Sequence, residues 1–141
     1  AKSKEDAIKF IKKIIIFIGS FTFLISIFLF LGAGLILNIL AGNQYENSII
    51  ILRILSFVPF IVGFSNVFGV LFLIALGYAK RVSRVQFTVA ICYPLILVPM
   101  TYYFKDIGTA ISYLTVESVI TLTFWKIYRN VIKELKASST E

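Results

Sequence analysis

Charge is missing from long stretches of this sequence, and the first such stretch runs from Ile14 to Tyr45. Further apolar stretches follow it, interrupted within their length only by Arg53 and Glu117. About a quarter of the residues in a soluble domain are charged, whereas this chain has 15% and gathers them between the apolar stretches. Uncharged runs of about 20 residues are stable in a bilayer and too long for a soluble fold to bury. The sequence therefore predicts membrane-spanning helices.

The apolar stretches predict an all-α membrane protein with four transmembrane helices. We place these helices at about residues 14–41, 49–79, 85–104 and 107–125, with a basic lead-in at 1–13 and a basic tail at 126–141. The loops between them, AGNQYEN, KRVSR and KD, are short, so neighbouring helices are expected to run antiparallel. In the first helix, the triplet Gly32-Ala33-Gly34 indicates a flex point or a close-packing patch.

The basic residues predict the orientation of these helices. In a four-span arrangement, 12 of the 14 Lys and Arg residues fall on one side of the membrane. They are Lys2, Lys4, Lys9, Lys12, Lys13, Lys80, Arg81, Arg84, Lys126, Arg129, Lys133 and Lys136. The other side receives only Arg53 and Lys105. Because Lys and Arg are retained on the cytoplasmic side, both ends of the chain are expected in the cytoplasm. This placement of the charge argues against nucleic acid as a partner.

The tail after residue 125 is amphipathic if it is helical. Tyr128, Val131, Ile132 and Leu135 share one face, and basic residues surround them. Two interpretations are open at this point. The tail lies on an anionic leaflet with its apolar face in the membrane, or it is the solvated end of the last transmembrane helix.

No catalytic or metal-binding constellation is visible, so the sequence predicts neither an enzyme nor a cofactor. It contains no His, and its single cysteine, Cys92, lies in an apolar run. A Gly-rich phosphate loop and a nucleophile elbow are also missing from the sequence, and no apolar segment contains a pair of carboxylates. Candidate sites must therefore come from polar residues at membrane depth.

Glu117 is the first candidate, because a carboxylate in the middle of a membrane helix is costly and normally faces a partner, a cavity or water. Thr109, Tyr113, Glu117 and Thr121 recur every four residues and so lie along one helical face. Glu117 is expected either to face a cavity, where it binds substrate or cycles a proton, or to bridge two helices as a structural group. The spacing does not decide between these roles.

Arg53 and Asn66 are two weaker candidates on the second predicted helix. Arg53 lies about one turn from its outer end, where it either extends to the headgroups or contacts an anionic substrate. Asn66 continues a small and polar stripe formed by Ser56, Pro59 and Gly63, at spacings of about one turn. Such a stripe lines a pathway or lets two helices pack closely, and Pro59 is expected to kink the helix.

Two segments carry a family resemblance: LAGNQYENSIIILRILSFVPFIVGFSNVFGV, from Leu40 to Val70, and LGYAKR, from Leu76 to Arg81. Both resemble segments of the Wzx-type polysaccharide flippases of the multidrug/oligosaccharidyl-lipid/polysaccharide exporter superfamily. The segment IGTAIS at Ile107, which leads to Glu117, and the lysine-rich KEDAIKFIKK before the first helix extend the resemblance. Members of this family have about twelve or more helices, so the resemblance implies that this chain is the C-terminal third of such a transporter.

The resemblance also implies a substrate and partners. The substrate would be an undecaprenyl-pyrophosphate-linked sugar repeat unit, moved across the inner membrane for O-antigen or other surface polysaccharide. Its partners would be membrane lipids, the upstream helices of the same transporter and a polysaccharide polymerase. Other readings stay open: a small four-helix homo-oligomeric exporter using Glu117, a drug or peptidoglycan-precursor exporter of the same superfamily, or a membrane anchor subunit. The first residue is Ala rather than Met, which also suggests a piece of a longer protein.

Overall fold

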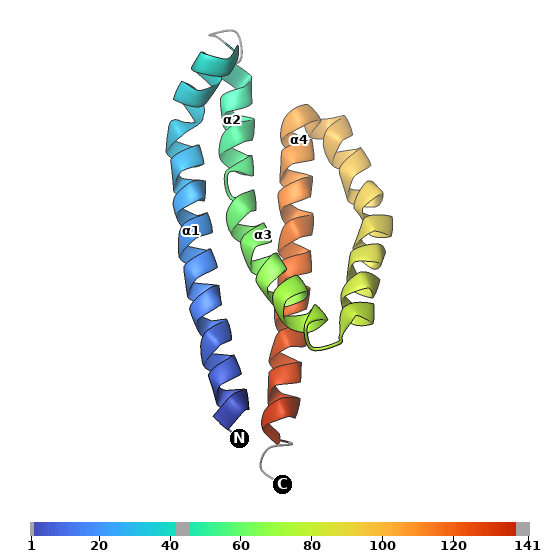
Figure 1. Cartoon of the computed structure of the whole chain (residues 1–141). Helices are drawn as coiled ribbons and strands as arrows, with labels where there is room; N and C mark the ends of the chain where they lie inside the picture. Colours follow the sequence, from blue (N-terminus) through green and yellow to red (C-terminus); the bar gives the residue numbers. More distant parts are fainter. Residues whose placement is uncertain (1, 42–45, 138–141) are drawn as a thin grey trace.

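The computed structural model describes residues 2–41 and 46–137, and nearly all of them are helical. The elements are α1 (Lys2–Ala41), α2 (Glu46–Leu55), α3 (Val58–Asn66), the π-helix η1 (Val67–Ile74) and α4 (Ala79–Ala137). No strand occurs in the described ranges. This confirms the all-helical class that the apolar stretches predict (Figure 1).

Within the described residues, three helical stretches are long and apolar enough to cross a membrane: Lys13–Leu40, Ser48–Ile74 and Ala79–Glu134. The third is 56 residues long, more than twice the length that one crossing requires. It is interrupted at Lys105, whose φ of 50° and ψ of −131° are not helical. Figure 1 shows that α4 folds back there, so that its two halves lie side by side. We call residues 79–104 the first arm and residues 106–137 the second arm.

The last two predicted helices are therefore arms of one kinked element, because the two-residue KD segment reverses the chain almost without a loop. The second connection also differs from the prediction. The turn lies at Ala75–Tyr78, and the KRVSR segment forms the first turns of α4. Gly77, with a φ of 87°, ends η1 there: its N–H donates to the Ile74 carbonyl, and the Tyr78 N–H donates to the Leu73 carbonyl. This pair of bonds is a Schellman motif, which glycine at the left-handed position favours.

The segment formed by α2, α3 and η1 is the central element of the fold. It contacts α1 on one side and α4 on the other (Figure 1). Its helix is interrupted at Ser56 and Phe57, just before Pro59 at the start of α3, as the kink prediction requires. The helix α1, in contrast, runs unbroken through Gly32-Ala33-Gly34. Of that triplet, Ala33 is fully buried, which supports close packing rather than flexion.

The buried core lies toward the end of the molecule that carries residues 2 and 137, which we call the lower end (Figure 1). Its buried side chains come from η1 and both arms of α4: Phe68, Phe72, Leu73, Val82, Phe124 and Val131. A series of aromatic contacts extends it upward along α3, through Phe64 and Phe60 to Phe23 of α1, with ring centroids 5.0–6.0 Å apart.

The basic tail belongs to this core. The second arm continues as a helix to Ala137, Val131 is fully buried, and Tyr128 and Ile132 pack against the core cluster. The apolar face of the tail is therefore occupied inside the protein. This favours the continuation of the last helix over a helix lying on the leaflet; the side chain of Leu135 lies outside the described residues.

Candidate functional site

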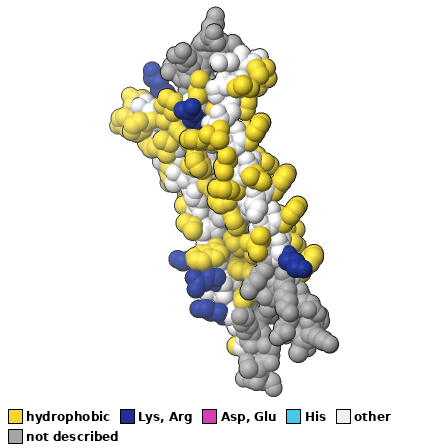
Figure 2. Space-filling view, turned by 90° about the vertical axis from the view of Figure 1, so that its left-hand side faces the viewer, with side chains coloured by type: hydrophobic (Ala, Val, Ile, Leu, Met, Phe, Trp, Pro, Cys, Tyr) yellow, Lys and Arg dark blue, Asp and Glu magenta, His cyan; other side chains and the backbone are white. Residues whose placement is uncertain are grey.

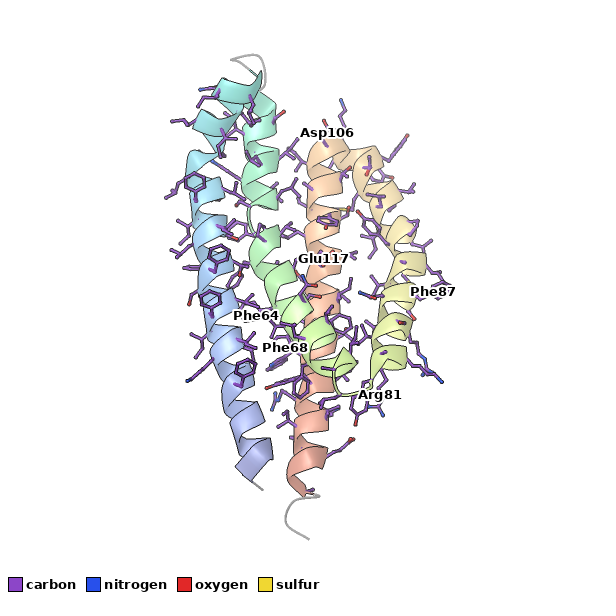
Figure 3. All side chains as sticks on the ribbon, viewed as in Figure 1. Phe64, Phe68, Arg81, Phe87, Asp106 and Glu117 are labelled. Carbon is purple, nitrogen blue, oxygen red and sulfur yellow. The ribbon has the colours of Figure 1, made fainter. Side chains whose placement is uncertain are left out.

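Glu117 lies about midway along the second arm and is partly buried (Figure 3). One turn above it, the Tyr113 hydroxyl is close enough to its carboxylate for the two groups to interact electrostatically. One turn below it, the Thr121 hydroxyl donates to the Ile61 carbonyl of α3 at 3.2 Å and to the Glu117 carbonyl at 2.8 Å. A hydrogen bond therefore links the second arm to α3 just below Glu117. Above Glu117, the polar face of the second arm is not covered by α3.

An open pocket of about 420 Å³ lies above Glu117, between α2 and the two arms of α4. Ile51 and Leu55 of α2 line one side, and Tyr93 lines the side of the first arm. The second arm contributes Asp106, Thr109, Ala110 and Tyr113. Tyr93 is close enough to Tyr113 to act on it electrostatically. The pocket therefore combines an apolar wall with two phenol groups, a carboxylate and a hydroxyl.

The four residues predicted to share one face of the second arm, Thr109, Tyr113, Glu117 and Thr121, do lie along the side that faces the pocket and α3. Thr109 and Tyr113 line the pocket, Glu117 lies below it, and Thr121 closes the face against α3. The Thr109 hydroxyl also pairs with the hydroxyl of Thr101 on the first arm at 2.8 Å, which joins the two arms near the kink. An open, mostly apolar pocket edged by hydroxyl groups can hold a hydroxyl-rich ligand by hydrogen bonds and ring contacts.

The structure does not bring the three predicted site residues together. Arg53 is exposed near the end of α2, and its guanidinium carbon lies 5.7 Å from the centre of the Phe30 ring of α1. Asn66 is an exposed residue at the end of α3. Neither residue lines the pocket above Glu117. The stacking of Arg53 on an aromatic ring fits a group that extends toward the headgroups.

Tyr93 and Asp106 are pocket residues that the sequence reasoning missed. The sequence places Asp106 in the short KD connection, and the kink makes it one of the residues that line the pocket. Figure 3 shows it at the upper end of α4. Tyr93 carries one usable signal. It lies in the middle of an apolar stretch, whereas Tyr102 and Tyr103 lie near the end of that stretch. A tyrosine far from the membrane interface needs a partner for its hydroxyl, and this could have indicated the pocket.

No group of His, Cys, Asp or Glu that could hold a metal ion occurs among the described side chains. Cys92 is exposed on the first arm. The polar groups of the pocket come from both arms and from residues 20 positions apart, so they form one site only because α4 folds back at Lys105. A single uninterrupted helix would separate Tyr93 from Tyr113 along its axis by about 30 Å.

Comparison with known proteins gives one informative relative. The chain is 34% identical over 105 residues to an Escherichia coli (strain K12) protein named as a candidate O-antigen transporter. The match covers 74% of this chain but spans only 25% of the length of that relative. No protein-family model matches the chain, and no solved structure matches it significantly. The long apolar helices are those of a membrane protein, and the chain is similar to part of a protein named for transport. The comparison confirms the resemblance found in the sequence, because this chain is similar to part of a protein named for O-antigen transport.

Proposed function

We propose that this chain forms the C-terminal third of a flippase that moves a lipid-linked polysaccharide repeat unit across the inner membrane. The observation that carries the proposal is the sequence relationship to the candidate O-antigen transporter over 74% of the chain. The matched segment spans a quarter of that relative, so the remaining helices of the transporter would come from the rest of the polypeptide. Transport across a membrane requires no catalytic group, in keeping with the absence of a catalytic motif from the sequence.

The proposed topology has four crossings, with α1, the α2–α3–η1 segment and the two arms of α4 each crossing once. Its support is the distribution of charge. Arg53 and Lys105 belong to the upper end of Figure 1, whereas the basic turns of α4 belong to the lower end. The positive-inside tendency then puts the lower end, with both termini, in the cytoplasm. The pocket between α2 and the arms would open toward the outer side.

In this proposal the transporter works by alternating access. The polyprenyl tail stays in the lipid while the saccharide passes through a polar path, and the outer pocket receives the sugar. Tyr93 and Tyr113 present ring faces and hydroxyls, and Asp106 presents a carboxylate, groups that suit sugar hydroxyls. None of the described residues that line the pocket is basic, so residues outside this chain would bind the pyrophosphate. Glu117, below the pocket, is the group placed to respond to protons during the cycle.

Replacement in the relative tests this proposal. The segment of the E. coli relative that matches this chain is exchanged for this chain, and the chimera is expressed in a strain that lacks its flippase. We expect surface polysaccharide to return with the chimera and not with residues 1–141 alone, at equal membrane levels of both. Restoration by residues 1–141 alone would support the small homo-oligomeric exporter instead. A well-expressed chimera without surface polysaccharide would count against the flippase assignment.

A further inference from the structure

Two arginines near the lower end stack on aromatic rings, one on each arm of α4. The guanidinium carbon of Arg81 lies 4.9 Å from the centre of the Tyr78 ring, at the start of the first arm. The guanidinium carbon of Arg129 lies 4.9 Å from the centre of the Trp125 ring, on the second arm. Stacking of this kind holds a guanidinium in place and leaves its N–H groups at the edge available to a ligand.

The hydrophobic core brings these two pairs to the same end of the molecule. Val82 follows Arg81, Val131 follows Arg129 by two residues, and both valines are buried in one cluster. Tyr78, in the turn just before the first arm, and Tyr128 of the second arm pack against the same cluster. The first turns of the first arm and the last turns of the second arm are therefore neighbours. Figure 3 places Arg81 at this lower level, far from Asp106 at the kink.

The lower ends of the two arms are strongly basic: they carry Lys80, Arg81, Arg84, Lys126, Arg129 and Lys133. We call these six residues with Tyr78 and Trp125 the basic–aromatic surface. All six are exposed, and Glu134 is the one acidic residue described within these turns. Figure 2 shows Lys and Arg side chains toward both ends of the molecule, with a group of them toward the lower end and no acidic side chain visible in that view.

Apolar side chains lie one turn deeper than this surface. On the second arm, Leu122 is 59% exposed and Val119 is 48% exposed, so both present apolar surface above Trp125. A ligand that fits such a surface has a charged phosphate at one end and an acyl chain at the other. A soluble anion would use the arginines but leave this apolar surface uncovered.

We propose that the basic–aromatic surface binds the phosphate headgroup of an anionic membrane lipid, whose acyl chains lie along the second arm. The two guanidiniums donate N–H hydrogen bonds to the phosphate oxygens, and the stacked rings hold them in position before binding. Tyr and Trp at this level are typical of the headgroup region of a bilayer. The proposal concerns this chain in any bilayer, so it does not depend on the proposed transport function.

The single tryptophan of the chain makes the test direct, because Trp125 belongs to the proposed site. The full chain is reconstituted with phospholipids whose brominated acyl chains quench tryptophan on contact, either anionic phosphatidylglycerol or zwitterionic phosphatidylcholine. Quenching across mixtures of the two gives their relative affinity at Trp125. We expect a preference for the anionic lipid, and we expect Arg129→Gln to lower it about fivefold.

Arg81→Gln should lower the preference by a similar factor, although Arg81 lies on the other arm from Trp125. Arg53→Gln removes the same charge at the upper end and should leave the preference unchanged. The double variant Arg81→Lys with Arg129→Lys keeps both charges but loses the stacked forks, and it should lose about two- to fivefold. Each variant is first shown to keep its helical content, and its quenching is normalised to its fluorescence in unbrominated lipid.

Three results would overturn the proposal. Equal quenching by the two lipids would remove the site altogether. Full preference in the double lysine variant would leave only a diffuse charge effect without the arginine pair. Loss of the preference on addition of soluble pyrophosphate, at constant ionic strength, would assign the surface to a soluble phosphate compound instead of a lipid.

Discussion

Gly69 of η1 is the position where the packing between the central segment and α4 can be tested most sharply. A β-carbon built on Gly69 would lie 2.6 and 2.8 Å from two ring carbons of Phe124. Non-bonded carbons prefer about 3.5–4.0 Å, so Gly69→Ala must displace the ring by about 1 Å. Phe124 is 1% exposed and belongs to the core cluster, so little free space is available for that displacement.

Overpacking of a well-packed core lowers the free energy of unfolding by about 1–3 kcal/mol. An opposing effect must be separated from it, since alanine is favoured over glycine in a helix by about 1 kcal/mol. Gly34→Ala measures that opposing effect alone, because a β-carbon on Gly34 meets nothing within 4 Å. The unfolding free energy of Gly69→Ala should therefore lie about 1–3 kcal/mol below that of Gly34→Ala.

The assay is unfolding of the purified chain in increasing sodium dodecyl sulfate, followed by circular dichroism for both variants in parallel. Phe124→Leu in the Gly69→Ala background should recover part of the loss, because the smaller side chain makes room for the added methyl group. Equal stability of the two alanine variants would contradict this prediction, because it would mean that a β-carbon at position 69 does not clash with the Phe124 ring.

Three further predictions address the site and the topology. Glu117→Gln should keep membrane level but lower export and flatten its pH dependence, while Glu117→Leu should lower level and export together; normal pH-dependent export by the Gln variant would leave Glu117 a structural role. In a Cys92→Ser background, Tyr103→Cys should react with an impermeant thiol reagent from outside and Arg84→Cys should not; outside labelling of the Arg84 position would exclude four crossings. Thr121→Val removes the hydrogen bond to α3 and should cost about 1 kcal/mol in the same detergent unfolding assay, with Thr121→Ser as the conservative control.

The membrane class and the approximate limits of the helices could be predicted from the sequence. A long uncharged run has a favourable transfer free energy into a bilayer, whichever residues it later packs against. The same reasoning placed Thr109, Tyr113, Glu117 and Thr121 on one face, since the period of a helix fixes which residues share a side. It missed Tyr93, because a side chain on another arm enters a pocket only through packing.

The basic tail is a second case in which the sequence pattern leaves two environments open and the packing distinguishes them. Its amphipathic pattern left open whether Val131 faces lipid or protein, since both environments are apolar and the sequence signal is identical. In the structure Val131 faces protein, because it is fully buried in the core cluster that contains Phe124.

Two properties can be predicted from the sequence alone: the chain forms membrane helices, and the basic residues gather at particular ends of those helices. These properties follow from local free energies, namely hydrophobic transfer, backbone hydrogen bonding and the charge of short segments. The reversal of α4 at Lys105 is known only from the folded structure. It brings Tyr93 and Tyr113 into one pocket and places Arg81 and Arg129 at the same end of the molecule. Such groupings depend on contacts between residues distant along the chain, and those contacts form through shape and packing that no local pattern encodes.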